Sequence, residues 1–425
     1  MELKKYKLGE ILDVTRGASL SGEFYATEGE YIRLTCGNFD YQNNCFKENK
    51  SKDNLYYTGD FRSEFLMGKG DIITPLTEQA IGLLGSTAII PESGKYIQSQ
   101  DVAKIICKED LLDKDFAFYL ISSTLVKQQL SAAAQQTKIR HTSPDKIKDC
   151  TVWIPELAEQ KRIGKLLRSL DRKIELNRAI NQNLEAMAKQ LYDYWFVQFD
   201  FPNEEGKPYK SSGGEMVWNE KLKRDIPASW KTKAIEDIAD VYNGATPSTV
   251  NEQNYGGDIV WITPKDLSDQ KQKFVYQGER NISQAGYNSC STHLLPPNTI
   301  LMSSRAPIGL LSIAKTELCT NQGFKSFVPK AENISTYLYY YLNIHIKQIE
   351  QLGTGTTFKE VSREDVLKFP ILKPSDAILG LWEKRVSALN NKQFVIQKEN
   401  EFLTKQRDEF LPLLMNGQVS VNSDL

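Results

Sequence analysis

Cysteine, histidine and long apolar runs are scarce in this chain of 425 residues. Its six cysteines include no two at the short spacing of a zinc knuckle or redox pair, so we expect scattered reduced thiols. The three histidines form no closely spaced pair, which argues against a zinc site. No run approaches the roughly 18 apolar residues of a membrane span, and the first residues lack the apolar core of a signal peptide. These absences predict a cytoplasmic protein without a metal centre or a membrane span.

Motifs of catalysis are also missing. The chain has no G-x-S-x-G, no H-E-x-x-H and no repeated carboxylate pair. Gly353–Thr357 reads G-T-G-T-T, but it follows a helix-like segment and no Lys-Ser/Thr follows it, so a phosphate loop is not indicated. Asp200, Glu204 and Glu205 lie in a polar segment, where we expect solvated charges. The sequence therefore predicts a non-enzyme with no catalytic residues.

The bulk composition predicts an ordinary globular protein of two to four domains. Hydrophobic residues make up 40% and charged residues 25%, and the formal net charge is −1. A net charge this small does not indicate a nucleic-acid binder. Any such function must depend on local clusters of side chains.

The chain contains an internal repeat. Gly17 in T-R-G-A and Gly244 in Y-N-G-A lie 227 residues apart, as do Gly82 in A-I-G-L-L and Gly309 in P-I-G-L-L. Pro155 and Pro374 then close the two globular halves. Between these anchors the halves have diverged strongly. Diverged copies with a common organisation suggest one mechanical task performed on two different targets.

Each half ends in a long helix-like run with a heptad pattern, which predicts a coiled coil. The first covers 156–199 and the second 376–415, with Leu411-Pro412 and Asn416-Gly417 predicted to end the second. An amphipathic helix in an ordinary bundle is the alternative. Met187 and Tyr194 fall on the second apolar position of the heptads of the first helix. Asn400 lies next to the apolar positions of the second helix. The predicted seam consists of Ile163, Leu166, Leu170, Asn177, Leu184, Leu191, Leu389, Ile396, Leu403 and Phe410.

These patterns predict an α+β protein with two similar α/β domains, joined by two long helices that form an antiparallel coiled coil with pseudo-twofold symmetry. Predicted strands include 30–34, 71–74, 88–90, 102–107 and 299–302, and 116–130 reads as a helix. We expect domains over 1–155 and 226–375, helical regions over 156–200 and 376–425, and an exposed, irregular linker over 201–225. Two helices of about 40 residues would be roughly 60 Å long. Such a length is compatible with two DNA-binding domains placed over successive major-groove half-sites.

Polar loops occur at corresponding places in both halves. The loops of the first half are Thr15–Ser19, Cys36–Asp40, Pro75–Gln79, Gln98–Asp101 and Gln135–Ser143. The loops of the second half are Asn243–Thr249, Thr263–Asp266, Met302–Pro307, Thr320–Lys325 and Gly353–Lys359. Their Gln, Asn, Arg, Lys, Ser and Thr residues are of the types that read base edges or hold phosphates. The recurrence of the loops predicts one binding face in each half.

Several motifs together carry a resemblance to a known family. Pro155-x₃-Glu159-Gln160 followed by Leu170-Asp171, and the aromatic end Tyr194-Trp195-Phe196, resemble the first helical region of DNA-specificity subunits of type I restriction–modification systems. Gly244-Ala245-Thr246-Pro247-Ser248, Gly257–Trp261 and Asn321–Phe324 resemble parts of a target-recognition domain of that family. The resemblance covers essentially the whole chain.

The resemblance implies a mechanism and a set of partners. Each target-recognition domain would read one half of a bipartite site in double-stranded DNA. The coiled coil would set the spacing and dock two adenine methyltransferase subunits, which flip the target base. Restriction subunits with ATPase and nuclease activity would join the larger complex. The chain itself would bind no cofactor, and S-adenosylmethionine, ATP and Mg would bind to the partner subunits.

We predict the DNA contacts from the polar loops. In the first half they are Arg16, Ser19, Asn38, Gln79, Gln100, Lys138 and Arg140. In the second half they are Thr246, Ser248, Lys265, Ser304, Arg305, Asn321, Gln322, Thr356 and Lys359. Arg305 stands out because the Ala306-Pro307 turn after it can hold a guanidinium outward, and arginine binds guanine or phosphate through two bonds.

Two rival functions remain open. A non-enzymatic coiled-coil scaffold with two ligand-binding domains predicts no salt-sensitive binding to duplex DNA. An enzyme with its active site between the halves predicts catalysis by the purified chain alone.

Overall fold

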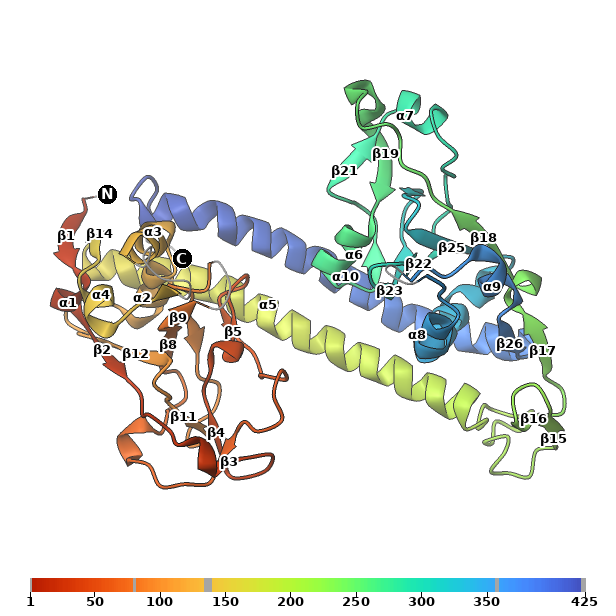
Figure 1. Cartoon of the computed structure of the whole chain (residues 1–425), viewed down its shortest axis with the longest axis horizontal. Helices are drawn as coiled ribbons and strands as arrows, with labels where there is room; N and C mark the ends of the chain where they lie inside the picture. Colours follow the sequence, from red (N-terminus) through yellow and green to blue (C-terminus); the bar gives the residue numbers. More distant parts are fainter. Residues whose placement is uncertain (1, 79–81, 134–139, 356–358, 422–425) are drawn as a thin grey trace. The chain divides into compact units, whose positions relative to one another are not determined.

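The computed structural model describes residues 2–78, 82–133, 140–355 and 359–421 (Figure 1). The chain packs into two compact units. The first unit comprises Met1–Leu176 and Glu401–Leu425, and the second comprises Asn177–Asn400. Each unit contains one β-rich domain and part of each of two long helices.

The domain of the first unit is built on an antiparallel sheet with the strand order β10-β8-β12-β2. These strands are β2 (Leu12–Arg16), β8 (Ile72–Pro75), β10 (Ala88–Ile89) and β12 (Val102–Cys107). A second sheet, in the order β11-β4-β7-β3, consists of β3 (Tyr25–Ala26), β4 (Tyr31–Arg33), β7 (Tyr56–Tyr57) and β11 (Tyr96–Ile97). Three further pairs are β1 (Lys4–Lys7) with β14 (Thr151–Ile154), β5 (Phe39–Asp40) with β6 (Cys45–Phe46), and β9 (Thr77–Glu78) with β13 (Arg140–His141).

The helices of this domain are α1 (Leu8–Ile11), α2 (Lys114–Ile121), α3 (Thr124–Ala133) and α4 (Pro144–Lys148). The single helix predicted over 116–130 is in fact two helices. The hydroxyl of Ser122 donates to the carbonyl of Phe118 at 3.1 Å, a side-chain bond that competes with continuation of the helix. Ser122, Ser123 and Thr124 interrupt the apolar pattern at this break, but the apolar residues on both sides of it favoured a single helix.

The domain of the second unit has a five-stranded sheet in the order β18-β25-β22-β23-β20. These strands are β18 (Ala239–Asn243), β20 (Phe274–Val275), β22 (Ile300–Ser304), β23 (Ile308–Ala314) and β25 (Phe324–Pro329). Beside it, β19 (Tyr255–Ile262) pairs with β21 (Arg280–Ile282) and β24 (Cys319–Thr320), and β17 (Lys231–Ala234) pairs with β26 (Pro370–Lys373). The helices are α6 (Pro264–Gln270), α7 (Gln284–Asn288), α8 (Ser335–Gln351) and α9 (Arg363–Lys368).

Two long helices supply the other part of each unit, α5 (Leu157–Tyr192) and α10 (Asp376–Met415). In the first unit Arg407 bonds to Asp171, and in the second Asn177 bonds to Glu399. Asn181, one turn later on α5, bonds to the carbonyl of Gln393, which lies earlier on α10, so the two segments pack antiparallel in the second unit. The predicted class, two similar mixed α/β domains with two long antiparallel helices, is confirmed.

The predicted seam needs one correction in its register. Ile163, Asn177, Leu184 and Ile396 are buried, and Leu166, Leu170, Leu191, Leu389 and Leu403 are partly buried. The second buried column of α5, however, contains Leu167, Ile174 and Ala188, one residue later than the predicted column with Met187 and Tyr194, which are exposed. Adjacent Leu166 and Leu167 satisfy both registers, so the sequence pattern was ambiguous.

The end of the predicted stripe on α10 is also wrong. Phe410 is 40% exposed, whereas Arg407 and Leu414 are buried in that stretch. Arg407 takes an interior position because its charge is paired with Asp171. The helix also continues through Pro412 and ends at Met415, where Gly417 adopts a left-handed conformation with φ of 71°.

The segment 201–225 is folded rather than irregular. Phe201 stacks between Tyr209 and Trp230, with ring centroids 4.7 and 4.8 Å away. Asp200, expected to be solvated, is buried and accepts hydrogen bonds from the backbone and hydroxyl of Ser211 at 2.8 and 2.6 Å. Strands β15 (Met216–Asn219) and β16 (Arg224–Pro227) then form a hairpin. The proline, glycine and serine content predicted the turns of this segment correctly, but it did not predict the aromatic contacts of Phe201 with Tyr209 and Trp230.

The aromatic run after α5 enters the core of the second unit. A π-helical turn covers Asp193–Val197. Trp195 and Phe196 are buried there, and Phe196 packs against Tyr337 and Trp382 at centroid distances of 4.8 and 5.1 Å. Buried aromatic side chains contribute about 1.5–3 kcal/mol each. The run thus attaches the end of α5 to the second domain.

Candidate nucleic-acid interface

A close crossing of two loops organises each domain. In the second unit, the amide of Ala245 donates to the carbonyl of Thr320 at 3.0 Å. A Cβ atom on Gly244 would lie 2.2 Å from the carbonyl oxygens of Thr320 and Asn321, so only glycine permits this approach. The crossing therefore holds the loop after β18 against the loop after β24.

The first unit contains the same crossing. The amide of Ala18 donates to the carbonyl of Gln98 at 2.9 Å. A Cβ atom on Gly17 would lie 2.2 Å from that carbonyl oxygen. The two glycines identified in the sequence repeat thus have the same physical role, although the loops around them differ.

A further pair of loops meets in each unit. In the second unit, the amide of Val361 donates to the carbonyl of Ser304 at 3.1 Å. In the first unit, the amide of Thr142 donates to the carbonyl of Leu76 at 2.9 Å. The amide of Ser304 donates to the carbonyl of Gly323 at 2.8 Å, which joins both loop pairs of the second unit. The loops predicted to form a binding face therefore converge in that domain.

The predicted contacts of the second unit fall into two groups. Thr246, Ser248, Lys265, Gln322 and Lys359 are exposed. The hydroxyl of Thr246 donates to the side-chain carbonyl of Gln322, and Lys265 pairs with Glu279 at 2.7 Å. Asn321 and Arg305 are half-buried.

Ser304 is not an available contact. Its side chain is buried, and its hydroxyl donates to Glu360 at 3.3 Å. Ser304 therefore contacts Glu360 and does not present its hydroxyl at the surface.

In the first unit, Arg16, Ser19 and Gln100 are exposed, and the guanidinium of Arg16 donates to the carbonyl of Gln100 at 2.8 Å. Asn38 is only 2% exposed. Its side-chain oxygen accepts from the amide of Thr35 at 2.9 Å and its nitrogen donates to the carbonyl of Lys47 at 3.3 Å. The side chain of Asn38 is therefore occupied within its own loop and is not presented at the surface as the predicted contact requires.

Four predicted contacts lack a described side chain. The backbone of Arg140 pairs with Glu78 in β13 and β9. Gln79, Lys138 and Thr356 lie outside the described residues.

Glu360 is the main residue that the sequence reasoning missed. Its carboxylate lies 3.2 Å from the ammonium of Lys325 and 3.7 Å from the guanidinium of Arg305. A carboxylate is not a residue type expected to contact an anion such as DNA, so the sequence pattern indicated Lys359 in this loop and not Glu360. Lys325 belongs to the predicted polar loop Thr320–Lys325 but was not among the predicted DNA contacts.

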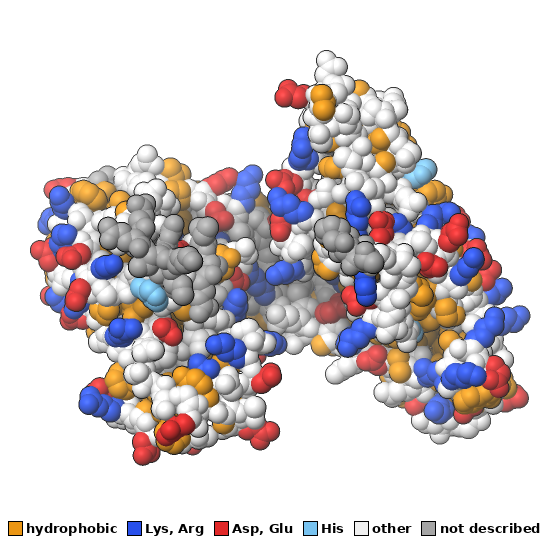
Figure 2. All heavy atoms as spheres, viewed as in Figure 1, with side chains coloured by type: hydrophobic (Ala, Val, Ile, Leu, Met, Phe, Trp, Pro, Cys, Tyr) orange, Lys and Arg blue, Asp and Glu red, His pale blue; other side chains and the backbone are white. Residues whose placement is uncertain are grey.

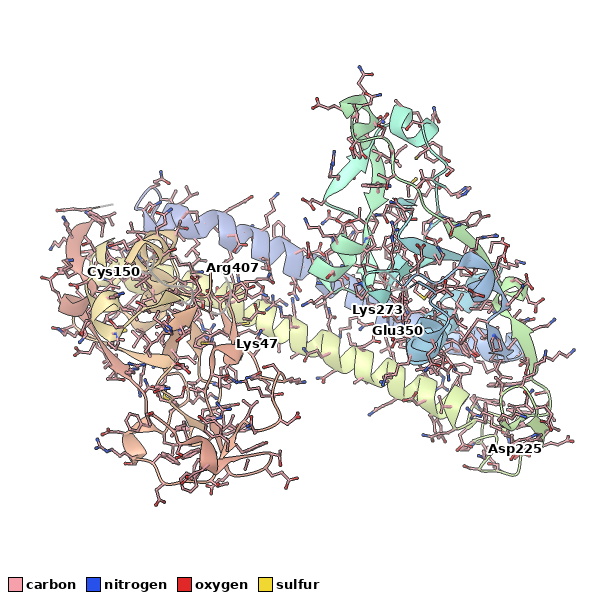
Figure 3. All side chains as sticks on the ribbon, in the orientation of Figure 1. Lys47, Cys150, Asp225, Lys273, Glu350 and Arg407 are labelled. Carbon is pink, nitrogen blue, oxygen red and sulfur yellow. The ribbon has the colours of Figure 1, made fainter. Side chains whose placement is uncertain are left out.

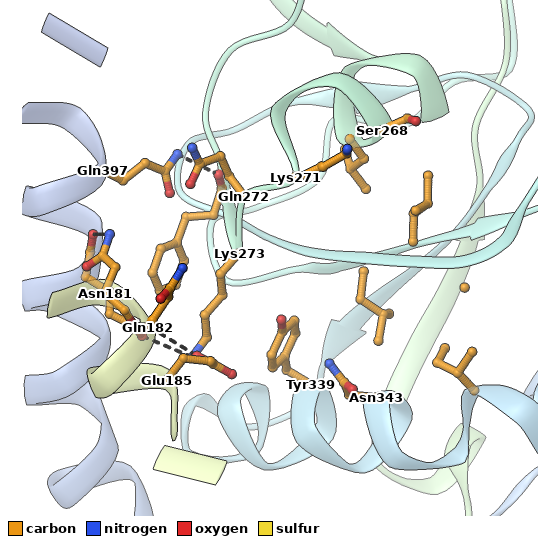
Figure 4. A pocket seen from close by; sticks show the side chains of 17 residues that line it. Asn181, Gln182, Glu185, Ser268, Lys271, Gln272, Lys273, Tyr339, Asn343 and Gln397 are labelled. Carbon is orange, nitrogen blue, oxygen red and sulfur yellow. Dashed lines mark hydrogen bonds and ion pairs between the residues drawn. The ribbon is translucent and has the colours of Figure 1, made fainter. Parts of the chain in front are cut away.

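A buried lysine attaches the second domain to both helices of its unit. The ammonium of Lys273 (Figure 3) donates to Glu185 of α5 at 2.8 Å, as drawn in Figure 4, and also to Tyr340 of α8 at 2.6 Å and to Asn390 of α10 at 2.8 Å. Burial lowers the pKa of Lys273, and the carboxylate of Glu185 opposes that shift. These bonds fix the domain on the helix pair.

A buried ion pair has the same role in the first unit. The guanidinium of Arg407 donates to one oxygen of Asp171 at 2.9 Å, and the hydroxyl of Tyr119 in α2 donates to the other. Gln160 adds a second attachment, since it accepts from the amide of Asp113 at 3.0 Å and donates to the carbonyl of Leu111 at 3.1 Å. The Glu159-Gln160 motif is thus structural.

A cavity with a volume of about 680 Å³ lies in the second unit (Figure 4). Gln182 and Gln397 line it from the helices, and Lys271, Tyr339 and Asn343 line it from the domain. No group of three His, Cys, Asp or Glu side chains in the described part of the chain could hold a metal ion. In the same part, no helix is long and apolar enough to span a membrane.

Charges of both signs are interspersed on the visible surface of the second unit rather than gathered into one basic field (Figure 2). This agrees with the net charge of −1. On this face, a selective contact with DNA must therefore depend on the local geometry of the loops rather than on one broad positive patch.

Comparison with known proteins matches both halves to one family. The family model "Type I restriction modification DNA specificity domain" matches residues 1–186 and 227–401. A type I restriction enzyme specificity subunit (MjaIX) of Methanocaldococcus jannaschii is 38% identical over 186 residues, which is 42% of this chain and 42% of that protein. The HindI specificity subunit of Haemophilus influenzae is 27% identical over 377 residues, 76% of this chain and 81% of that protein.

A solved structure shares the fold. The S subunit of a type I restriction–modification system from M. genitalium matches with a TM-score of 0.64 and 16% identity, over 98% of this chain and 96% of that one. Together with the family match over both halves, these findings show that the chain belongs to the type I restriction–modification DNA-specificity family.

Proposed function

We propose that this chain is the DNA-recognition subunit of a type I restriction–modification complex. Each β-rich domain reads one half of a bipartite site in double-stranded DNA. The observation that carries the proposal is the glycine-dependent loop crossing, built once in each domain on different loop sequences. A loop crossing that is repeated in both domains, with different loop sequences around it, suits two unequal half-sites, since base readout depends on the side chains presented.

The helices supply the spacing and the docking site in this proposal. α5 and α10 each contribute to both units, so they join the domains covalently. Buried polar bonds at Lys273 and at Arg407 hold each domain on its part of the helices. Two adenine methyltransferase subunits dock on the helical regions, and restriction subunits complete the complex.

The chain is non-catalytic and cytoplasmic in this proposal. S-adenosylmethionine, ATP and Mg bind to the partner subunits, which flip the target adenine and carry out the chemistry. The partner subunits also provide some of the contacts to the DNA phosphates, which is compatible with the small net charge of this chain.

A domain exchange tests whether each domain reads its own half of the DNA site. Residues 226–375 are replaced by the corresponding domain of a relative, and modified adenines are mapped in cells that also carry the methyltransferase. We expect one half of the recognised site to change and the other half to remain. Modification of unrelated positions, or an unchanged site, would contradict readout by separate domains.

A further inference from the structure

Glu360 presents an acidic group at a surface that should meet an anion. Its backbone is fixed, because Glu360 and Thr354 exchange backbone hydrogen bonds of 3.0 and 3.1 Å. The next residue, Val361, bonds to the carbonyl of Ser304 at 3.1 Å. The carboxylate is therefore held at the end of β22, beside Arg305, by two independent backbone contacts.

The two cations around this carboxylate are not equivalent. The ammonium of Lys325 lies 3.2 Å from Glu360, and the Lys325 side chain is only 6% exposed. Arg305 is 39% exposed, and its guanidinium lies 3.7 Å from the second carboxylate oxygen. The second distance exceeds that of an ordinary hydrogen bond of about 2.7–3.2 Å. Lys325 is thus the permanent partner of Glu360, because a buried charge needs its counter-charge.

Arg305, by contrast, can change partners. A loose, partly exposed ion pair contributes little stability, about 0–1 kcal/mol. A phosphate or a guanine edge can therefore compete with Glu360 for the guanidinium. The carboxylate would meanwhile repel any phosphate that approaches without a compensating base contact.

We propose that Glu360 is a specificity-determining residue of the second domain, acting on DNA through Arg305. It holds the guanidinium near the surface and disfavours capture by phosphates at unrelated sequences. At the correct half-site, a bidentate contact between Arg305 and a base replaces the ion pair between Arg305 and Glu360. This inference rests on the proposed function and assigns discrimination against non-specific DNA to one carboxylate.

The variant Glu360→Gln tests the proposal in the complex with the methyltransferase subunits. Glutamine keeps an oxygen that can accept from Lys325 and Ser304, and it removes the negative charge. Binding is measured on a duplex with the mapped site and on an unrelated duplex, over a range of salt concentrations. We expect affinity for the unrelated duplex to rise several-fold and affinity for the mapped site to stay unchanged, so that the ratio of specific to non-specific affinity falls by the same factor. The slope of log K against log salt on the unrelated duplex should steepen by about 0.9, as for one added phosphate contact.

Glu220→Gln is the matched control, because it makes the same charge change at a pair with Lys223 in the β15–β16 turn. Equal effects of the two variants would overturn the inference, since they would reflect net charge alone. Loss of specific binding by Glu360→Gln with no change on the unrelated duplex would also overturn it and indicate a structural role. A thermal unfolding curve checks that the variant is folded, and Glu360→Ala repeats the test if it is not. A wild-type complex that does not prefer its mapped site would instead refute the proposed function itself.

Discussion

At the scale of single residues, the loop positions decide how each polar side chain can be used. The polar loops of the sequence offered both Asn38 and Arg305 as DNA contacts, with Arg305 as the strongest candidate. In the structure Arg305 is half-exposed, whereas both ends of the Asn38 amide are bonded within a turn. A list of polar residues cannot distinguish an amide that closes a turn from one that faces solvent. Glu360 escaped prediction because an acid was not expected at a DNA-binding surface.

Arg305→Ala should weaken binding to the second half-site. If the guanidinium contacts a base, the loss is about 1–3 kcal/mol and discrimination at that base pair relaxes. Fluorescence anisotropy with duplexes altered at each position of the half-site measures both effects. Arg280→Ala is the control, since that guanidinium stacks on Tyr255 at 4.0 Å. An Arg305→Ala complex with unaltered affinity and methylation pattern would remove Arg305 from the interface.

His345 should make the second unit sensitive to mild acid. Burial lowers the pKa of His345, against an opposing hydrogen bond from its ring to the carbonyl of Tyr341. The neutral form is thus favoured in the folded chain, while the unfolded chain takes up a proton as the pH falls through about 6.5. The resulting contribution to stability is present above that pH and is lost as the pH falls toward the folded-state pKa.

We therefore expect His345→Gln to reduce the drop in unfolding temperature between pH 7.5 and pH 5.5. Differential scanning calorimetry measures the drop, and the exposed His293, changed to Gln, is the control. An identical drop in wild type and His345→Gln would show that another group causes the sensitivity.

At the scale of elements, the positions of the two long helices were predictable and their register was not. The starts of α5 and α10 follow Pro155 and Pro374 by two residues, as the uninterrupted runs after those prolines predicted. The second seam column was shifted by one residue because Leu166 and Leu167 fit both registers. Buried polar bonds also select the register, since Asn177 donates to Glu399 at 2.8 Å. Such pairings depend on the partner helix and could not be read from one helix alone.

Arg407→Met should strongly destabilise the first unit. The side chains of Arg407 and Asp171 are 10% and 11% exposed, so the substitution leaves a buried carboxylate without its cation. Breaking a buried pair by removing one partner costs about 3–5 kcal/mol. Urea unfolding of the purified chain measures the change, with the exposed Lys405→Met as the control on the same helix. A cost of less than about 1 kcal/mol would mean that solvent screens the pair as at a surface.

At the scale of the whole molecule, the sequence repeat anticipated the duplicated architecture. Gly17 and Gly244 mark the same loop crossing in the two domains, and this constraint on the backbone is why they remain recognisable after divergence. The segment 201–225 was less predictable, since its turns resemble a linker and its aromatic contacts are long-range. The bases that the domains read depend on loop side chains, on water and on DNA deformation, so the sequence does not specify them.

The central claim is that this chain directs adenine modification to a bipartite site. Single-molecule mapping of modified adenines tests it most directly, in cells that carry this chain and its methyltransferase and in cells that lack only this chain. The account predicts a two-part motif with one modified adenine on each strand, present in the first cells and absent from the second. An identical adenine map in both, with the methyltransferase shown to be active, would contradict it.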